Sequence, residues 1–397
     1  MDNLEENGAR PEETEAAQEP WDDLEQQARA HEEAGRWADA AQAWRKLYAM
    51  AWRHAYQQSR GLLIVAPVGP SPHLARPALS AQQEKARLAA LGVRPVTCLR
   101  HQFPDTGGQG PGVTALAFSP DEEHLVSASE ASTLWLWSAT QEELLHSWRA
   151  HEGDIWSVAI SPDGARMASA SEDGTVALWE LPSGREIRRL SAEMGPVNAV
   201  AFFPDGARLV TGADDGTVCL WDLHTGEAVL VLEGHYGPVL GVACGPDASL
   251  LASAAEDGLV LLWEVRAGQE ILRIEPELGP MNAIAFSPDG TLLAAGGDSG
   301  AVGVWEVPMG RPIHILEGHE KAVNGLAFSP DGSLLASASA DRTMRLWSAR
   351  FGWEVYALER HSDWVSCIAF APAGSFLASG SYDATVWFWL LAEGQHL

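Results

Sequence analysis

Seven tryptophans recur along the chain at a constant interval of 42 residues, as from Trp137 to Trp179. The others are Trp221, Trp263, Trp305, Trp347 and Trp389. A fixed period of this length indicates a repeat architecture, in which neighbouring units bury a common core. This spacing constrains the fold more than any other feature of the sequence.

Each unit shows the same order of strand and turn signals. An apolar strand such as VNGLAF precedes the turn SPDG, and a second strand such as LLASAS precedes a tight turn such as EDG. A third strand ends at the tryptophan, and a glycine turn such as LHTG leads to a fourth strand such as EAVLVLE. In these turns Pro presets φ, Asp bonds its own backbone and Gly supplies a positive φ. Four short strands per unit predict an all-β propeller rather than a sandwich.

The pattern resembles the WD-repeat family of seven-bladed propellers over residues 94–397. The Trp-Asp pair itself occurs at Trp221-Asp222, and the Gly-His signature occurs at Gly234-His235 and Gly318-His319. The resemblance implies four-stranded antiparallel blades, with each repeat supplying the outer strand of one blade and three strands of the next. The last blade then lacks an outer strand, and we expect residues 94–103 to supply it beside Trp389 and to close the ring.

The first 93 residues have a different character. Residues 1–20 are acidic and almost without apolar side chains, so we expect a disordered tail. Residues 21–60 have helical periodicity and resemble a single tetratricopeptide-type hairpin, which must dock on the propeller or on a partner. Residues 61–93 should form a Pro-rich linker and a short helix that stops at Gly92.

Histidine, serine, aspartate and tryptophan occur at constant offsets in four repeats, a combination that suggests a hydrolase triad. A triad is needed once, so we interpret the repeated set as structural. The family resemblance implies a hydrogen-bonded tetrad, in which Asp accepts from His and His links to Ser and the indole. The four sets are His151, Ser169, Asp173 and Trp179; His235, Ser253, Asp257 and Trp263; His319, Ser337, Asp341 and Trp347; and His361, Ser379, Asp383 and Trp389.

The other three repeats depart from this set. The repeat of Trp221 keeps Thr211 and Asp215 but has Glu193 at the histidine position. The others have Glu277, Ala295 and Ser299 before Trp305, and Gln109 and Ala131 before Trp137. We expect packing to hold these blades more than hydrogen bonds do.

The composition and spacing argue against several classes of function. The net charge of −28 disfavours nucleic acid and membrane partners. Four dispersed cysteines and the absence of a secretion signal predict a cytoplasmic protein without disulfides. Constant spacing leaves no insertions for an active site, and no phosphate loop or metal motif occurs. We therefore expect no enzyme activity, cofactor, metal or small-molecule substrate; a ligand or metal in the central channel would support the catalytic alternative.

The residue before the tight-turn Asp faces a frequent partner surface in this family. That offset holds acids in five successive repeats: Glu130, Glu172, Asp214, Glu256 and Asp298. The last repeat has Tyr382 at this offset, and the family's geometry places the strand-entry residues Trp156, Tyr236 and Trp364 beside these acids. Either the acids steer a basic protein partner to aromatic anchors, or they are merely solvated while Trp156 or Trp364 packs between blades.

We therefore expect a non-catalytic protein–protein interaction scaffold or adaptor that binds through one propeller face. The alternative is a structural subunit of a larger complex that docks mainly through the helical hairpin.

Overall fold

A computed structural model describes residues 85, 88, 91–101, 110–191 and 195–393, which belong to one compact unit, Ala81–Leu397. The predictions for residues 1–20, for the hairpin 21–60 and for most of the segment 61–93 lie outside the described residues. Within them, no helix is long and apolar enough to cross a bilayer.

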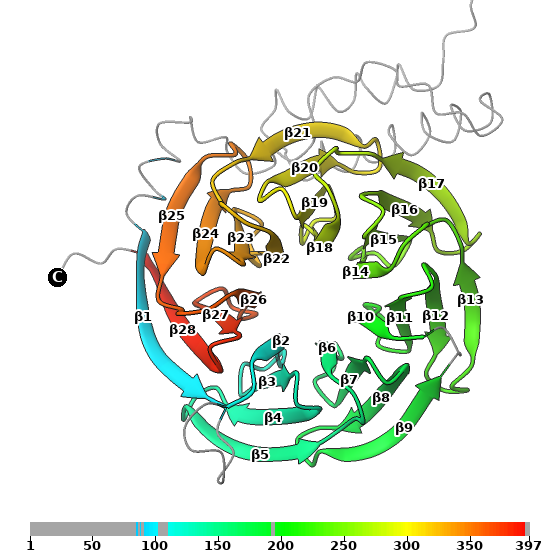
Figure 1. The fold of residues 1–397 in the computed structure, drawn as a ribbon, viewed down its shortest axis with the longest axis horizontal. Coiled ribbons are helices and arrows are strands. Elements are labelled where there is room, and N and C mark those ends of the chain that lie inside the picture. The colour runs from blue at the N-terminus through cyan, green and yellow to red at the C-terminus, as the bar shows by residue number, and fades with distance from the viewer. Residues whose placement is uncertain (1–84, 86–87, 89–90, 102–109, 192–194, 394–397) are drawn as a thin grey trace, which may run out of the picture. The chain divides into compact units, whose positions relative to one another are not determined.

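The described residues form seven four-stranded antiparallel sheets, the blades, arranged around a central axis (Figure 1). Blades 1 to 3 consist of β2 (Val113–Phe118), β3 (His124–Ser129), β4 (Thr133–Ser138) and β5 (Glu143–Arg149); β6 (Ile155–Ile160), β7 (Arg166–Ser171), β8 (Thr175–Glu180) and β9 (Arg185–Ser191); and β10 (Val197–Phe202), β11 (Arg208–Ala213), β12 (Val218–Asp222) and β13 (Ala228–Leu232).

Blades 4 to 6 continue in the same order from the inside of the ring outward. They consist of β14 (Val239–Cys244), β15 (Leu250–Ala255), β16 (Val260–Glu264) and β17 (Gln269–Ile274); β18 (Met281–Phe286), β19 (Leu292–Gly297), β20 (Val302–Glu306) and β21 (Arg311–Leu316); and β22 (Val323–Phe328), β23 (Leu334–Ser339), β24 (Thr343–Ser348) and β25 (Glu354–Glu359). The seven-bladed propeller with four-stranded antiparallel blades is thus confirmed.

Blade 7 combines segments from both ends of the described chain. Its inner strands are β26 (Val365–Phe370), β27 (Phe376–Ser381) and β28 (Thr385–Glu393), and its outer strand is β1 (Leu91–Arg100). β1 pairs antiparallel with β28, from Leu91 opposite Glu393 to Arg100 opposite Thr385. Figure 1 shows the cyan strand β1 beside the red strand β28.

The closing strand lies further toward the N-terminus than its sequence prediction. It begins at Leu91 rather than at residue 94, because β28 runs past Trp389 to Glu393 and offers three more pairing positions. Gly92 is therefore part of a strand, and its interpretation as a helix stop is wrong. β1 ends at Arg100, not at residue 103 as predicted, and His101 follows it outside the strand.

The core of the propeller lies in the seams between neighbouring blades. One cluster joins Leu178 of blade 2 to Leu209 and Trp221 of blade 3. Another joins Leu99 of β1 to Trp135 of blade 1, so the closing strand contributes to a seam of its own. Because neighbouring blades cover the second and third strands of each blade on both faces, segments such as β15 are small or apolar at every position.

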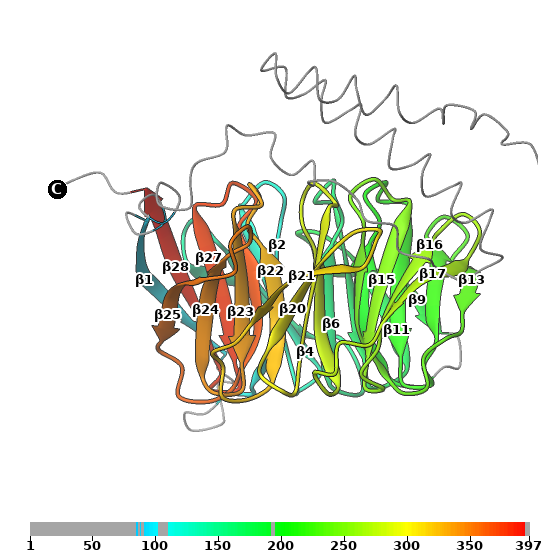
Figure 2. The ribbon, with the colours of Figure 1, turned by 90° about the horizontal axis from the view of Figure 1, so that it is seen from above.

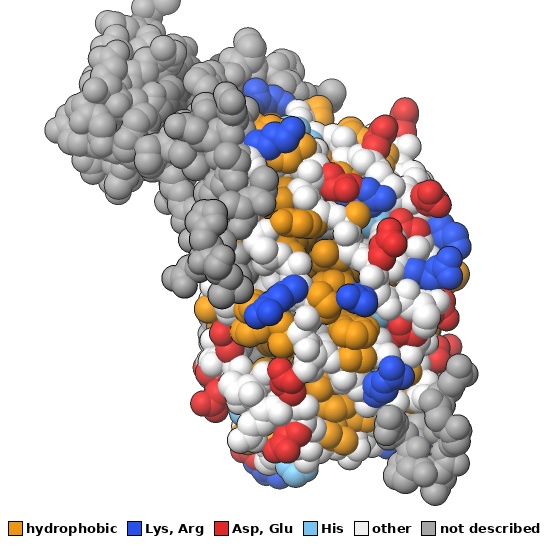
Figure 3. Space-filling model, turned by 90° about the vertical axis from the view of Figure 1, so that its left-hand side faces the viewer, with side chains coloured by type: hydrophobic (Ala, Val, Ile, Leu, Met, Phe, Trp, Pro, Cys, Tyr) orange, Lys and Arg blue, Asp and Glu red, His pale blue; other side chains and the backbone are white. Residues whose placement is uncertain are grey.

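The strands run between two faces of the ring (Figure 2). We call the face with the inner-strand starts and the turns between second and third strands the top face. These turns need a positive φ, which Gly174 supplies with φ 79° and Arg342 adopts with φ 73°. Figure 3 shows the rim over β1 and β25, where charged side chains flank a strip of apolar ones.

Candidate functional site

The histidine, serine, aspartate and tryptophan of blade 4 form one chain of hydrogen bonds. The indole Nε1 of Trp263 donates to Ser253 Oγ at 2.9 Å, and Ser253 Oγ lies 2.7 Å from His235 Nε2. His235 Nδ1 lies 3.0 Å from Asp257 Oδ2. Asp257 also accepts the backbone N–H of Tyr236 at 2.8 Å. The tetrad thus ties the top-face loop to the second and third strands.

The same contacts recur in blades 2, 6 and 7. The serine–histidine distances are 2.7 Å for Ser169, 2.7 Å for Ser337 and 2.8 Å for Ser379. The histidine–aspartate distances are 3.0 Å for Asp173, 2.9 Å for Asp341 and 3.0 Å for Asp383. The structure therefore brings together all four sets that the sequence singled out, each closed by its tryptophan: Trp179, Trp263, Trp347 and Trp389.

These distances match those of a catalytic triad, but the serine is not available for catalysis. The imidazole Nδ1–H donates to the carboxylate, so Nε2 accepts the serine hydroxyl proton, and the serine oxygen accepts the indole N–H. Ser253 is 0% exposed and lies between an imidazole and an indole. A nucleophile must reach a substrate carbonyl. The tetrad can hold the top-face loop in place by hydrogen bonds, but its buried serine oxygen has no access to a substrate.

Burial dominates the ionisation of two tetrad histidines. It lowers the pKa of His151 and His235, against the opposing charge and hydrogen bond of Asp173 and Asp257. For Asp173, burial alone would raise the pKa, but hydrogen bonds from Thr175, the Glu152 N–H and His151 together lower it. The pairs are thus held as neutral imidazole and carboxylate near neutral pH.

Blade 1 contains a histidine that the sequence analysis missed. His101, not Gln109, binds Ser127, with Nε2 2.7 Å from Oγ, and Trp137 donates to the same oxygen at 2.8 Å. His101 stacks on Trp135 at 3.7 Å between ring centroids. The prediction of Gln109 was wrong because residues 102–109, outside the described residues, shift the histidine by eight positions. The pair Arg100-His101, which matches Arg360-His361 before blade 7, was the available signal.

Ala131 replaces the tetrad aspartate in blade 1, and this substitution isolates one nitrogen of His101. Its Nδ1 makes no hydrogen bond of normal geometry with a described residue. Burial lowers the pKa of His101 to about 3, against a weaker opposing effect of the Pro111 backbone. Blades 3 and 5 lack the histidine contact among the described residues: Thr211 accepts from Trp221 at 3.0 Å, and blade 5 has Ala295 there.

The central channel is lined by the second residues of the inner strands, several of which are polar. These side chains donate to backbone carbonyls of the next blade, as from Asn198 to Val239 at 3.2 Å and from Asn324 to Val365 at 3.1 Å. Ser366 bonds Val113 across the closing seam at 2.5 Å. The polar groups therefore join neighbouring blades. Trp156 is half-buried in this lining.

All five acids of the tight turns are exposed on the top face. Asp214 accepts from Asn198 at 2.8 Å, Asp298 from Asn282 at 2.9 Å and Glu130 from the Gly112 N–H at 3.2 Å. Glu172 and Glu256 accept no hydrogen bond from a described residue. Asp214 and Asp298 are thus positioned by the channel wall and Glu130 by a backbone N–H, whereas Glu172 and Glu256 are left to solvent.

Two aromatic side chains on this face are strongly exposed: Tyr236 at 86% and Trp364 at 50%. Tyr236 is exposed on a backbone that Asp257 holds through its N–H. Trp364 makes a T-shaped contact with half-buried Tyr382, with ring centroids 6.1 Å apart. Trp364 therefore does not pack between blades.

The Trp364–Tyr382 pair lies in an acidic sector that spans blades 7, 1 and 2. The pKa of the Tyr382 hydroxyl is raised, chiefly by burial and then by the nearby groups of Glu130, Cys367, Asp154 and Asp363. Burial, with Glu172 and Glu130, raises the pKa of Asp154. The sequence analysis missed Asp154 and Asp363 because it looked for acidic residues only in the tight turns. Their position within two residues of an inner strand's start was the available signal.

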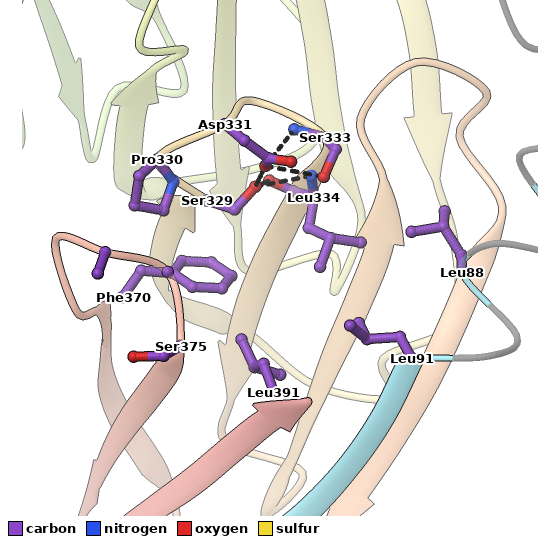
Figure 4. A pocket seen from close by; sticks show the side chains of 12 residues that line it. Leu88, Leu91, Ser329, Pro330, Asp331, Ser333, Leu334, Phe370, Ser375 and Leu391 are labelled. Carbon is purple, nitrogen blue, oxygen red and sulfur yellow. Dashed lines mark hydrogen bonds between the residues drawn. The ribbon is translucent and has the colours of Figure 1, made fainter. Parts of the chain in front are cut away.

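Two other features of the described residues offer little chemistry. A cavity of about 300 Å³ lies between blades 6 and 7 on the face opposite the top face, lined by Leu88, Leu91, Phe370 and Leu391 (Figure 4). Its polar groups bond one another, since Asp331 accepts from Ser329 at 2.7 Å and from Ser333. One set of potential metal ligands, Asp121, Glu123 and His124, lies near the surface, where Asp121 already caps its own turn.

The family model described as WD domain, G-beta repeat, matches seven segments of the chain: 95–138, 142–180, 184–222, 226–264, 271–306, 310–348 and 352–389. The first segment contains the second half of β1 together with the first three strands of blade 1, so the sequence repeats and the blades are out of phase by one strand. A search of curated proteins found no match.

Proposed function

Because the chain belongs to the WD-repeat family, whose model matches more than half of its length, we propose that it is a non-catalytic scaffold that binds a protein partner on its top face. Propellers of this family are typical interaction scaffolds. The observation that carries the proposal is the Trp364–Tyr382 pair set among Glu130, Asp154 and Asp363.

The chemistry of this sector favours a partner with a basic segment. Carboxylates around the pair attract Lys and Arg side chains, and an aromatic face adds a cation–π contact. Exposed Trp and Tyr are the residue types that most often anchor protein interfaces. Tyr236, across the ring on blade 4, offers a second anchor on a rigid backbone.

The tetrad supports this role indirectly. Asp173, Asp257, Asp341 and Asp383 each accept the N–H of the residue after the histidine, which positions the top-face loop before a partner binds. A preorganised surface loses less conformational entropy on binding.

The four unpaired cysteine thiols fit a reducing compartment, and they support the proposal that the protein is cytoplasmic. All four cysteines are free, and burial raises the pKa of Cys219 to about 11 and of Cys367 to about 12, so that they stay protonated.

The test compares binding kinetics of a partner captured from cells. Trp364→Ala should speed dissociation by at least about tenfold, because it removes a desolvated anchor. Glu172→Lys with Glu256→Lys should slow association at low salt. Ile315→Ala, an exposed side chain on the rim, is the matched control and should change neither rate.

The outcome that contradicts the proposal is specific. If Trp364→Ala binds normally while removal of residues 21–60 abolishes binding, the N-terminal segment is the contact, and the protein is a structural subunit. A stoichiometric metal or nucleotide in the purified protein would contradict the non-catalytic part.

A further inference from the structure

The outer strand of blade 3 differs from the other outer strands of the described propeller. β13 has the sequence AVLVL, without a charged residue, proline or histidine. Each of the other six carries at least two such residues: Arg94, Pro95 and Arg100 on β1; Glu143, His146 and Arg149 on β5; Arg185, Glu186, Arg188 and Arg189 on β9; Glu270 and Arg273 on β17; Arg311, Pro312 and His314 on β21; and Glu354 and Glu359 on β25.

Those residues have a physical purpose at a sheet edge. The outer strand bonds one neighbour and leaves a row of backbone N–H and C=O groups on its other side. Charged side chains and proline prevent another strand from pairing there. β13 pairs with β12 on one side and is the last strand of its sheet. It has none of this protection.

The side chains of β13 add an apolar surface to this edge. Val229 is 57% exposed and Val231 is 51% exposed. Leu230 between them is half-buried against Gly268 of the next blade. The strand therefore presents two β-branched side chains outward with a spacing that suits a strand laid beside it.

A glutamate stands at each end of this apolar strand. Glu227 precedes β13, Glu233 follows it, and both are exposed. Neither carboxylate forms an ion pair with a described residue, although Arg188 of β9 lies against the adjacent Gly226. The two charges lie six positions apart, about 20 Å in an extended strand.

The flanking charges decide between two occupants. If a second copy paired through β13, either strand direction would place glutamate near glutamate at both ends, and the net charge of −28 would add repulsion. An added strand with basic residues at both ends avoids this repulsion.

We propose that the edge of β13 binds an extended segment of a partner protein by strand addition, with apolar β-branched residues at its centre and Lys or Arg at both ends. The backbone of the segment bonds the free edge, its side chains contact Val229 and Val231, and its basic ends pair with Glu227 and Glu233. This site is separate from the top face.

The test selects a displayed library of random ten-residue segments on the full chain. Enriched segments should alternate β-branched residues over five positions with Lys or Arg on each side. Val231→Lys should weaken binding of the corresponding synthetic peptide at least about tenfold. Ile315→Lys, at a side chain 48% exposed on β21, is the matched control and should leave binding unchanged.

Two further variants keep the test decisive if Val231→Lys lowers the melting temperature. Glu227→Lys with Glu233→Lys should reverse the preference toward a peptide with acidic ends. N-methylation of alternate peptide nitrogens should abolish binding, because strand addition needs backbone N–H groups. The proposal is overturned if binding of the enriched segments does not depend on Val231, or if Val231→Lys and Ile315→Lys weaken it equally. It is also overturned if sedimentation shows that the chain dimerises through Val231.

Discussion

Blades 4 and 5 are neighbours with the same strand register but different polar contacts. Leu251 pairs with Trp263 in blade 4 as Leu293 pairs with Trp305 in blade 5. Blade 4 has its complete tetrad, whereas blade 5 has Ala295 in place of the serine.

The difference lies in what the turn residue reaches. Asp257 of blade 4 extends to His235 and to the N–H of Tyr236 across the top-face loop. Ser299 of blade 5 accepts the N–H of Ala301 within its own turn, at 3.2 Å. The comparison teaches that strand pattern and seam packing form a blade, and that the tetrad fastens a loop to it.

The largest effect should follow removal of a strand from a blade that keeps its tetrad. Deletion of residues 1–103 removes β1 and exposes β28, while His361 and Asp383 remain. We expect aggregation without a cooperative melting transition, because Leu99 leaves the closing seam. Deletion of residues 1–20 is the control and should not change melting. A soluble 104–397 fragment that melts cooperatively would contradict the role of β1 in closing the ring.

Removal of one tetrad carboxylate should have a smaller effect. Asp257→Ala leaves His235 and the Tyr236 N–H without their acceptor, and should lower the free energy of unfolding by about 1–3 kcal/mol. Ser299→Ala in blade 5 should cost under about 0.5 kcal/mol, since its turn is solvent-exposed. Chemical denaturation measures both. Equal costs would remove the distinction between the two blades.

The pH dependence of stability should distinguish a histidine with an aspartate from one without. Folding lowers the pKa of His101 to about 3, so below pH 6.5 the unfolded chain binds the extra proton and stability falls as pH falls. At pH 5 the loss from His101 is about 2 kcal/mol. His151 and His235, also lowered, contribute in the same direction below pH 6.5. Denaturation of His101→Gln between pH 7.5 and 5 should show a shallower slope; an unchanged slope contradicts the assignment.

Completing the tetrad of blade 1 should have the smallest effect. Ala131→Asp offers a carboxylate to His101 Nδ1, which lacks a partner among the described residues, and should add about 1 kcal/mol. The melting temperature should rise by about 2 °C, and NMR titration should show a higher His101 pKa. Ser299→Asp should add nothing, because Ala295 and Glu277 provide no network to join. If both variants raised stability, the carboxylate would be stabilising its own turn rather than bonding His101.

The sequence by itself determined the number of blades, their strand order and the four tetrads. Each depends on a local offset that recurs every 42 residues, and a hydrogen bond between residues such as Ser253 and Trp263 follows from strand pairing within one blade. The same logic predicted that an earlier segment must pair with the strand of Trp389.

Only the tertiary structure decided what depends on contacts between distant segments. The extension of β28 brought Leu91 into the closing strand, and the end of β1 placed His101 in the tetrad position of blade 1. Closure of the ring gathered Glu130, Asp154 and Tyr382 in one sector from three blades. Exposure of Val229 or Trp364 likewise depends on which neighbours cover it. A periodic sequence specifies the pairing within each unit, but the surface forms only where units meet.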